Sequence, residues 1–504
     1  MRLNILMWGL LFLLVSPFVI ANREITNNSR GVPISLRDKI VEINCDDVLI
    51  ANTVLTSDLN CTGDGIIINN SNVNLDCDGH TITYGNSGKN DVYGIYLMGI
   101  QSISGHDNVT IENCEIVEGN ELGNEKHGIY LEGEPANPFP GLYSENIIVK
   151  NNQVKTISSG SHALRTWGIG PESIIQNNYL ESLGDEGKGI SMMCTMQTVF
   201  LKNTIKTSLI DGIGIYVGDW GNNQNEIKEN IIVESDMGIQ VFLNEYVPTY
   251  QFWNDKILYE GNEIYNSRIG LFFSEDGHPL GPDSIIRNNI FVEINEEEVL
   301  MEENVDNQIF ENQNFGKYKI INSLLTIKKT GLGEVWFDER MTVSGDNLDE
   351  DVSIADNSIR VDINNKPAFN VSGHIVLDEP TTQFFAPYYV MKDNSRCTAP
   401  YGDVCTNYEN EGEEFSFDVS EMALEFSIEG SSDLVPDKKK NKNEINVIKE
   451  LEKRINETFE KETKDIKIGR SNKKTNNQVK KVVSIGSQIE AAKQDKKGFI
   501  SFYI

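Results

Sequence analysis

The chain has 504 residues and a formal net charge of −32 at pH 7, and 39% of its residues are hydrophobic. This length is sufficient for more than one domain. The charge excludes nucleic acid as a natural partner, because a phosphate backbone attracts the opposite sign. Surplus carboxylates on an exported chain form either a solvated face or weak Ca²⁺ sites, so Ca²⁺ is a candidate cofactor.

Residues 1–21 are predicted to be an export signal. Arg2 precedes an apolar run from Ile5 to Ile20, and Ala21 ends a stretch typical of a cleavage site. The run is short for a membrane span and contains Pro17, which argues against a retained anchor. We therefore expect a secreted protein, located at the cell surface or in the envelope, on which N-x-Ser/Thr sequons are available for glycans.

Cysteine usage fits an oxidising compartment. The sequence predicts a disulfide between Cys45 and Cys61, which flank the first strands. A second predicted disulfide joins Cys397 to Cys405 across a Pro-Tyr-Gly turn. Because the chain has seven cysteines, at least one thiol stays outside any disulfide within the chain, and Cys194 is the candidate.

A short phrase recurs between Gly94 and Phe291. Its first half is a glycine followed by alternating apolar residues, and successive copies lie roughly 21 to 40 residues apart. Its second half is an apolar strand that ends in asparagine and one further apolar residue. Copies of the first half begin at Gly94, Gly128, Gly189, Gly212, Gly238 and Gly270, with a degenerate copy at Gly168. Copies of the second half include Asn151-Asn152, Asn177-Asn178, Asn230, Asn262 and Asn288-Asn289.

The repeat predicts an all-β solenoid of stacked coils. Alternation of period two places Ile95 and Leu97 on one face of a strand and Tyr96 on the other. Strands this short bury their apolar face only by stacking on the next copy. Asparagine tolerates left-handed backbone, and its amide can bond to the coils above and below, so a column of asparagines can satisfy the bends.

The two phrases resemble the repeats of right-handed parallel β-helix proteins of the pectate-lyase-like superfamily. The stretches 54–61 and 72–82 are similar to the opening of NosD-like and archaeal cell-surface β-helix proteins. The resemblance covers roughly Cys45 to Phe291 and implies a right-handed parallel β-helix. It also implies that an outer face of the solenoid is the place where polysaccharides would be bound or cleaved.

The predicted organisation has five parts. Beyond the signal, residues 22–62 form an N-terminal cap, 63–318 the β-helix, 319–430 a small β-sandwich-like module, and 431–504 a Lys/Glu-rich tail. The tail contains one predicted amphipathic helix, with Ile448, Leu451, Ile455 and Phe459 on a single stripe, and is otherwise predicted to be disordered. Its basic charge can contact the acidic body of the chain, a neighbouring copy or an anionic envelope.

Aromatic residues at outward or bend positions are candidates for carbohydrate binding, because flat rings stack on sugar rings. Packing beneath loops is the alternative interpretation for the same residues. The candidates are Tyr96, Tyr130, Trp167, Tyr216 and Trp220.

The catalytic candidates lie in the bends that directly precede the glycine phrases. Asp185, Asp211 and Asp236 precede successive strands, and Lys188 lies beside the first of them. If the coils stack in phase, these groups form a carboxylate column suited to Ca²⁺-assisted sugar binding or to acid–base catalysis. Ordinary turn chemistry is the alternative interpretation.

Copper binding is a weaker hypothesis. Met192 and Cys194 are soft ligands of the kind that hold Cu(I), and NosD-like proteins are linked to copper-site maturation. Adjacent strand residues point to opposite faces, however, and methionine commonly fills core space. The six histidines are scattered in the sequence and provide no metal-ligand spacing.

The sequence therefore predicts an exported scaffold or adhesin that contacts glycans of the cell envelope or the extracellular space. Two alternatives stay open. One is a polysaccharide lyase or glycoside hydrolase, and the other is a NosD-like copper-handling protein.

Overall fold

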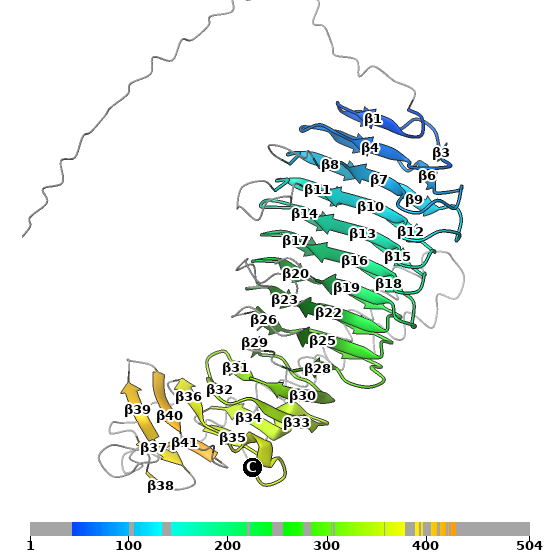
Figure 1. Ribbon diagram of the computed structural model, residues 1–504. Helices are drawn as coiled ribbons and strands as arrows, with labels where there is room; N and C mark the ends of the chain where they lie inside the picture. Colours follow the sequence, from blue (N-terminus) through cyan, green and yellow to red (C-terminus); the bar gives the residue numbers. More distant parts are fainter. Residues whose placement is uncertain are drawn as a thin grey trace, which may run out of the picture. The chain divides into compact units, whose positions relative to one another are not determined.

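The computed structural model describes residues 43–99, 105–133, 143–218, 222–243, 256–275, 284–303, 305, 308–356, 358–378, 389–392, 395–396, 405–410, 414–419, 422 and 425–429 (Figure 1). All of these belong to one compact unit. The expected signal segment, the tail, Trp220 and Cys397 lie outside the described residues, as does the side chain of Cys405. No helix in the described part is both long and apolar enough to cross a bilayer.

Most of the described strands belong to three sheets, which we call A, B and C. Sheet A contains β1 (Asp47–Leu49), β4 (Ile66–Ile68), β7 (Tyr93–Leu97), β10 (His127–Glu132), β13 (His162–Trp167), β16 (Lys188–Met193), β19 (Ile213–Val217), β22 (Met237–Leu243), β25 (Ile269–Glu275), β28 (Val299–Met301) and β30 (Tyr318–Ser323) in parallel, and β33 (Met341–Gly345) antiparallel at its end. Sheet B begins with β2 (Thr53–Val54), β5 (Asn74–Asp76), β8 (Val109–Glu112), β11 (Ile147–Lys150), β14 (Ile174–Gln176), β17 (Val199–Leu201), β20 (Glu226–Lys228), β23 (Leu258–Glu260), β26 (Ser284–Arg287), β29 (Gln308–Glu311) and β31 (Thr326–Lys329). Sheet C contains β3 (Leu59–Asn60), β6 (Thr81–Tyr84), β9 (Glu115–Glu118), β12 (Gln153–Thr156), β15 (Tyr179–Ser182), β18 (Thr204–Thr207), β21 (Ile231–Val233), β24 (Glu263–Tyr265) and β27 (Ile290–Val292).

The chain visits sheets A, B and C in turn, and each strand pairs in parallel with the equivalent strand one coil later. Figure 1 shows this succession of coils from β1 to β31. The protein is therefore a right-handed parallel β-helix, as the sequence predicted.

Coil stacking extends beyond the expected limits of the solenoid at both ends. At the start, β1 already pairs in parallel with β4, inside the segment expected to be a cap. At the other end, β29 pairs in parallel with β31, which ends at Lys329. A turn at Gly331, with φ of 74°, then reverses the chain into antiparallel β32 (Gly333–Phe337). This reversal ends the parallel stacking.

The C-terminal module grows directly out of sheet B. Its strands β32, β36 (Gly373–Asp378), β40 (Glu414–Val419) and β39 (Cys405–Asn410) add to that sheet in antiparallel fashion. A second antiparallel sheet contains β34 (Val352–Ala355), β35 (Ser358–Val361), β41 (Glu425–Glu429), β37 (Tyr389–Lys392) and β38 (Ser395–Arg396), with α1 (Leu348–Asp351) and η1 (Pro367–Phe369) nearby in sequence. Phe417 and Phe426 meet between the sheets with ring centroids 5.6 Å apart, so the module is sandwich-like.

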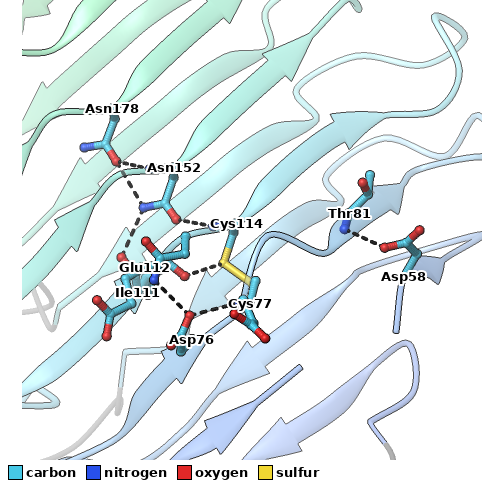
Figure 2. Close-up of a disulfide and its surroundings, with 11 residues drawn as sticks. Asp58, Asp76, Cys77, Thr81, Ile111, Glu112, Cys114, Asn152 and Asn178 are labelled. Carbon is cyan, nitrogen blue, oxygen red and sulfur yellow. Dashed lines mark hydrogen bonds between the residues drawn. A yellow bond between two sulfur atoms is a disulfide. The ribbon is translucent and has the colours of Figure 1, made fainter. Parts of the chain in front are cut away.

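A buried ladder of amides joins the bends between sheets B and C. The side-chain oxygen of Asn178 accepts hydrogen bonds from both the main-chain N–H and the side-chain amide of Asn152, each at 3.0 Å (Figure 2). The same geometry recurs from coil to coil, so every amide in the column satisfies buried backbone groups of its neighbours. The ladder runs through Asn152, Asn178, Asn203, Asn230, Asn262, Asn289 and Gln313, all of which are buried.

The residue before each ladder amide adopts left-handed backbone. Asn151 and Asn177 have φ of 57° and 55°, and Lys202 and Glu229 take the equivalent place with φ of 54° and 52°. Since lysine and glutamate are accepted there, the left-handed position does not select asparagine strictly. The buried position that follows selects it, because its amide must both donate and accept.

Two disulfides strengthen the first coils. One joins Cys45 to Cys61, the pair expected at the first strands. The other joins Cys77 to Cys114 and was not anticipated. Cys114 occupies the coil position that Asn152 holds one coil later, and its main-chain N–H donates to the Asn152 side-chain oxygen at 3.0 Å (Figure 2). Such bonds are typical of an oxidising compartment. Cys194 lies outside both disulfides.

Cys114 thus stands at the ladder position of its coil, and its disulfide to Cys77 takes the place of the amide hydrogen bonds there. We expect the double variant Cys77→Ala/Cys114→Ala to lose about 3–4 kcal/mol of unfolding free energy, since the bond closes a long loop. The double variant Cys77→Asn/Cys114→Asn should regain part of this loss by extending the ladder. Urea unfolding of the three proteins, with Cys45–Cys61 intact, measures both effects. Equal instability of the two variants would contradict the ladder interpretation.

Candidate functional site

The glycine phrase of β7 bends the strand so that two consecutive residues point inward. In β7, Gly94 and Ile95 are both buried, whereas Tyr93 and Tyr96 on either side are partly exposed. A Cβ atom at Gly94 would overlap the side chain of Ile116 from sheet C, so the glycine leaves room for that residue. The outer face of sheet A therefore carries both the residue before the glycine and the residue two places after it.

In-register stacking turns these outward positions into columns along sheet A, from β7 to β19. The first column pairs Tyr93 with His127 and His162 with Lys188. The second column runs through Tyr96, Tyr130, Arg165, Ser191 and Tyr216. A third contains Glu132, Trp167 and Met193. We call these residues the aromatic–cationic face.

Three tyrosines form the beginning of this face. The rings of Tyr96 and Tyr130 are stacked, with centroids 5.4 Å apart and planes within 6°. The ring of Tyr93 contacts both, at 4.8 and 5.2 Å. The Tyr96 hydroxyl donates a hydrogen bond to Glu132. Burial, reinforced by Glu132, raises the pKa of Tyr96 and Tyr130 far above the ordinary value, so both phenols are neutral.

Two histidines and an arginine continue the face. The rings of His127 and His162 stack with centroids 4.7 Å apart, and only 2% and 8% of these residues are exposed. The Arg165 guanidinium lies 5.3 Å from the Tyr130 ring centroid and 5.9 Å from that of Trp167. Its Nη1 lies 3.0 Å from His127 Nε2. Burial, with Arg165 and Lys188 nearby, lowers the pKa of His127 to about 3.

The fold brings together two histidines that are far apart in the sequence. His127 and His162 are distant in the sequence but lie on adjacent coils, and each directly precedes its coil's inward pair. His127 directly precedes Gly128, so the position before a glycine was a signal for it, whereas His162 precedes Ala163 and had no such signal. The degenerate phrase at Gly168 is also misplaced, because Leu164 of β13 pairs with Ile129 and Ile190, which puts Ala163 at the glycine position.

The expected carboxylate column is not formed as predicted. Asp236 is buried and held by Arg268, with distances of 2.6 and 3.0 Å to the guanidinium. Asp185 and Asp211 are exposed turn residues, and Asp211 has a φ of 54°. Lys188 lies on the aromatic–cationic face, where its Nζ is 4.3 Å from the ring centroid of Tyr216. Differences in coil length shift these positions out of register.

The candidate copper ligands point in different directions. Met192 is fully buried in the core, whereas Met193 faces outward and its sulfur lies 3.7 Å from Arg165 Nη2. Cys194 follows in a left-handed bend with φ of 47°. Within the described ranges, no three His, Cys, Asp or Glu side chains are placed to hold a metal ion. Binding of Ca²⁺ stays a prediction.

One comparison with known proteins agrees with the architecture. A family model described as a right-handed β-helix region matches residues 88–257. The structure is similar to DFA-IIIase from Arthrobacter chlorophenolicus A6, crystallised without its lid in complex with GF2, with 10% sequence identity over 51% of this chain and 70% of that chain and a TM-score of 0.25. It is also similar to the A-module of the mannuronan C-5 epimerase AlgE4 from Azotobacter vinelandii, with 10% identity over 56% and 86% of the two chains and a TM-score of 0.26. No curated protein matches the sequence. Similarity this low identifies neither a ligand nor an activity.

The buried neutral histidines make stability depend on pH. His127 has an ordinary pKa of 6.5 when unfolded and about 3 when folded, so the unfolded chain binds protons first as the pH falls. Stability is then full above pH 6.5 and declines between pH 6.5 and 3. Relative to a His127→Gln variant, the wild type should lose up to about 3 kcal/mol more between pH 7.5 and 4.5. Chemical denaturation at both pH values measures this difference, and parallel losses would refute it.

Proposed function

We propose that this protein is an exported cell-surface scaffold or adhesin that binds glycans along the aromatic–cationic face. The observation that carries the proposal is the cluster of Tyr93, Tyr96 and Tyr130 rings on successive coils of the outer face of sheet A. Aromatic faces stack on the apolar faces of sugar rings. A rigid sheet holds them in place before the ligand arrives, which lowers the entropic cost of binding.

The spacing and chemistry of the face suit an extended polymer. Adjacent strands of a sheet lie about 4.8 Å apart, so columns of side chains along sheet A repeat at that distance over many coils. Beside the rings, Glu132 offers a carboxylate and Lys188 an ammonium group for sugar hydroxyls. An oligosaccharide lying along the stacking direction would meet rings and polar groups on each coil.

Polysaccharide cleavage is the second candidate function, because one observation favours it. Glu132 accepts a hydrogen bond from the neutral Tyr96 phenol on the same face that carries Lys188. A carboxylate, a phenol and an amine are groups that serve general acid–base catalysis. Release of reducing ends or unsaturated products from a polysaccharide panel, abolished by Glu132→Gln, would favour the enzyme.

A matched pair of tyrosine variants tests the binding proposal. Tyr96→Ala removes a ring from the aromatic–cationic face and should weaken binding to the best glycan of an array at least tenfold, since stacking is lost. Tyr179→Ala removes an exposed tyrosine from the outer face of sheet C and should leave binding unchanged. Isothermal titration with folded variants measures both. Equal effects of the two changes, or no glycan bound by the wild type, would overturn the proposal.

A further inference from the structure

Arg165 is unusual among the arginines of this acidic chain. Arg268 pairs with Asp236 and Glu296, and Arg287 pairs with Glu260 and Glu311. Within the described part of the chain, no carboxylate forms an ion pair with Arg165. Its Nη1 faces a histidine and its Nη2 a methionine sulfur, which is a weak acceptor.

Two buried nitrogen atoms, one in this guanidinium and one in a histidine, also lack partners. Arg165 Nε and His162 Nδ1 are buried, and neither has a hydrogen-bond partner among the described residues. Leaving such a group unsatisfied is unfavourable, and more so when the group is charged. Both side chains contact His127, so the two atoms belong to one small region of the face.

His127 adds a further imbalance of donors over acceptors. The main-chain N–H of His162 points at His127 Nδ1 at 3.2 Å, while Arg165 Nη1 lies 3.0 Å from His127 Nε2. A neutral imidazole accepts at one nitrogen and donates at the other. One of these two contacts therefore brings two donors together, and one of these N–H groups has no acceptor at His127.

We propose that Arg165 and His162 bind the negatively charged group, a carboxylate or a sulfate, of an acidic sugar residue. This inference rests on the proposed glycan binding at the same face and names the class of glycan. The oxygens of the anion accept hydrogen bonds from the N–H at Arg165 Nε and from the neutral His162 tautomer that carries its proton on Nδ1, the two nitrogens that lack partners. Tyr130 and Trp167 flank the guanidinium and limit its movement. Lys188, in the same column as His162, adds positive charge.

The test compares four oligosaccharide probes of equal length on the full chain. The probes are a uronic-acid oligomer, its methyl ester, its carboxyl-reduced neutral form, and an O-sulfated neutral oligomer. The wild type should bind at least one charged probe ten times more tightly than the neutral probes, and whichever charged probe binds identifies the anion as carboxylate or sulfate. Equal affinity for charged and neutral probes would overturn this inference and leave glycan binding itself standing. Binding of no probe and of no array glycan would overturn both.

Variants then locate the anion-binding site. Arg165→Met should lower the affinity for the charged probe at least tenfold and leave the affinity for the neutral probe unchanged. Lys155→Met, on the outer face of sheet C, removes the same charge and should change neither affinity. Arg165→Lys keeps the charge but not the Nε donor and should recover only part of the binding. If Arg165→Met binds the charged probe like the wild type, the proposed anion-binding site is wrong. If the variant fails to fold, the comparison of the four probes on the wild type still decides whether a charged sugar is preferred.

Discussion

The buried amide ladder is the constraint on which the rest of the structure depends. A β-helix coil is held by little local structure, so its register relative to the next coil must be fixed by contacts between equivalent positions. Asn152 through Gln313 provide such contacts at the bend between sheets B and C, where main-chain groups would otherwise be buried without partners. The Cys77–Cys114 disulfide performs the same task at the first coils.

Fixed register determines which side chains meet on the outer face of sheet A. Because each coil sits directly on its neighbour, residues 34 to 38 positions apart in the sequence, such as Tyr96 and Tyr130 or His127 and Arg165, become contacts. The glycine phrase adds a second constraint by placing two successive residues inward. Together these features concentrate rings and cations on one face of sheet A in a chain whose overall charge is −32.

The sequence predicted the features that follow from a single coil. The inward positions of Ile95 and Leu97, the asparagine column and the alignment of Tyr96 with Tyr130 all follow from local periodicity, although Tyr130 is only 9% exposed. Contacts that depend on the length of the connecting turns were not predictable in the same way. Asp236 was expected in a column with Asp211 but pairs with Arg268 one coil later, and the stacked histidines were regarded as scattered. The Cys77–Cys114 pair was missed although Cys114 stands where the repeat places an asparagine.

The most direct test of this account is amide hydrogen exchange in an Asn203→Leu variant. The Asn203 side-chain oxygen accepts from the main-chain N–H of Asn178 at 3.1 Å, and the leucine removes this acceptor. The account predicts that the Asn178 amide loses its protection and that the unfolding free energy falls by about 2–4 kcal/mol. The exposed neighbour Asn177, with φ of 55°, should tolerate Asn177→Gly with little change in either quantity. Retained protection at Asn178 together with unchanged stability in Asn203→Leu would contradict the claim that the ladder fixes the stack.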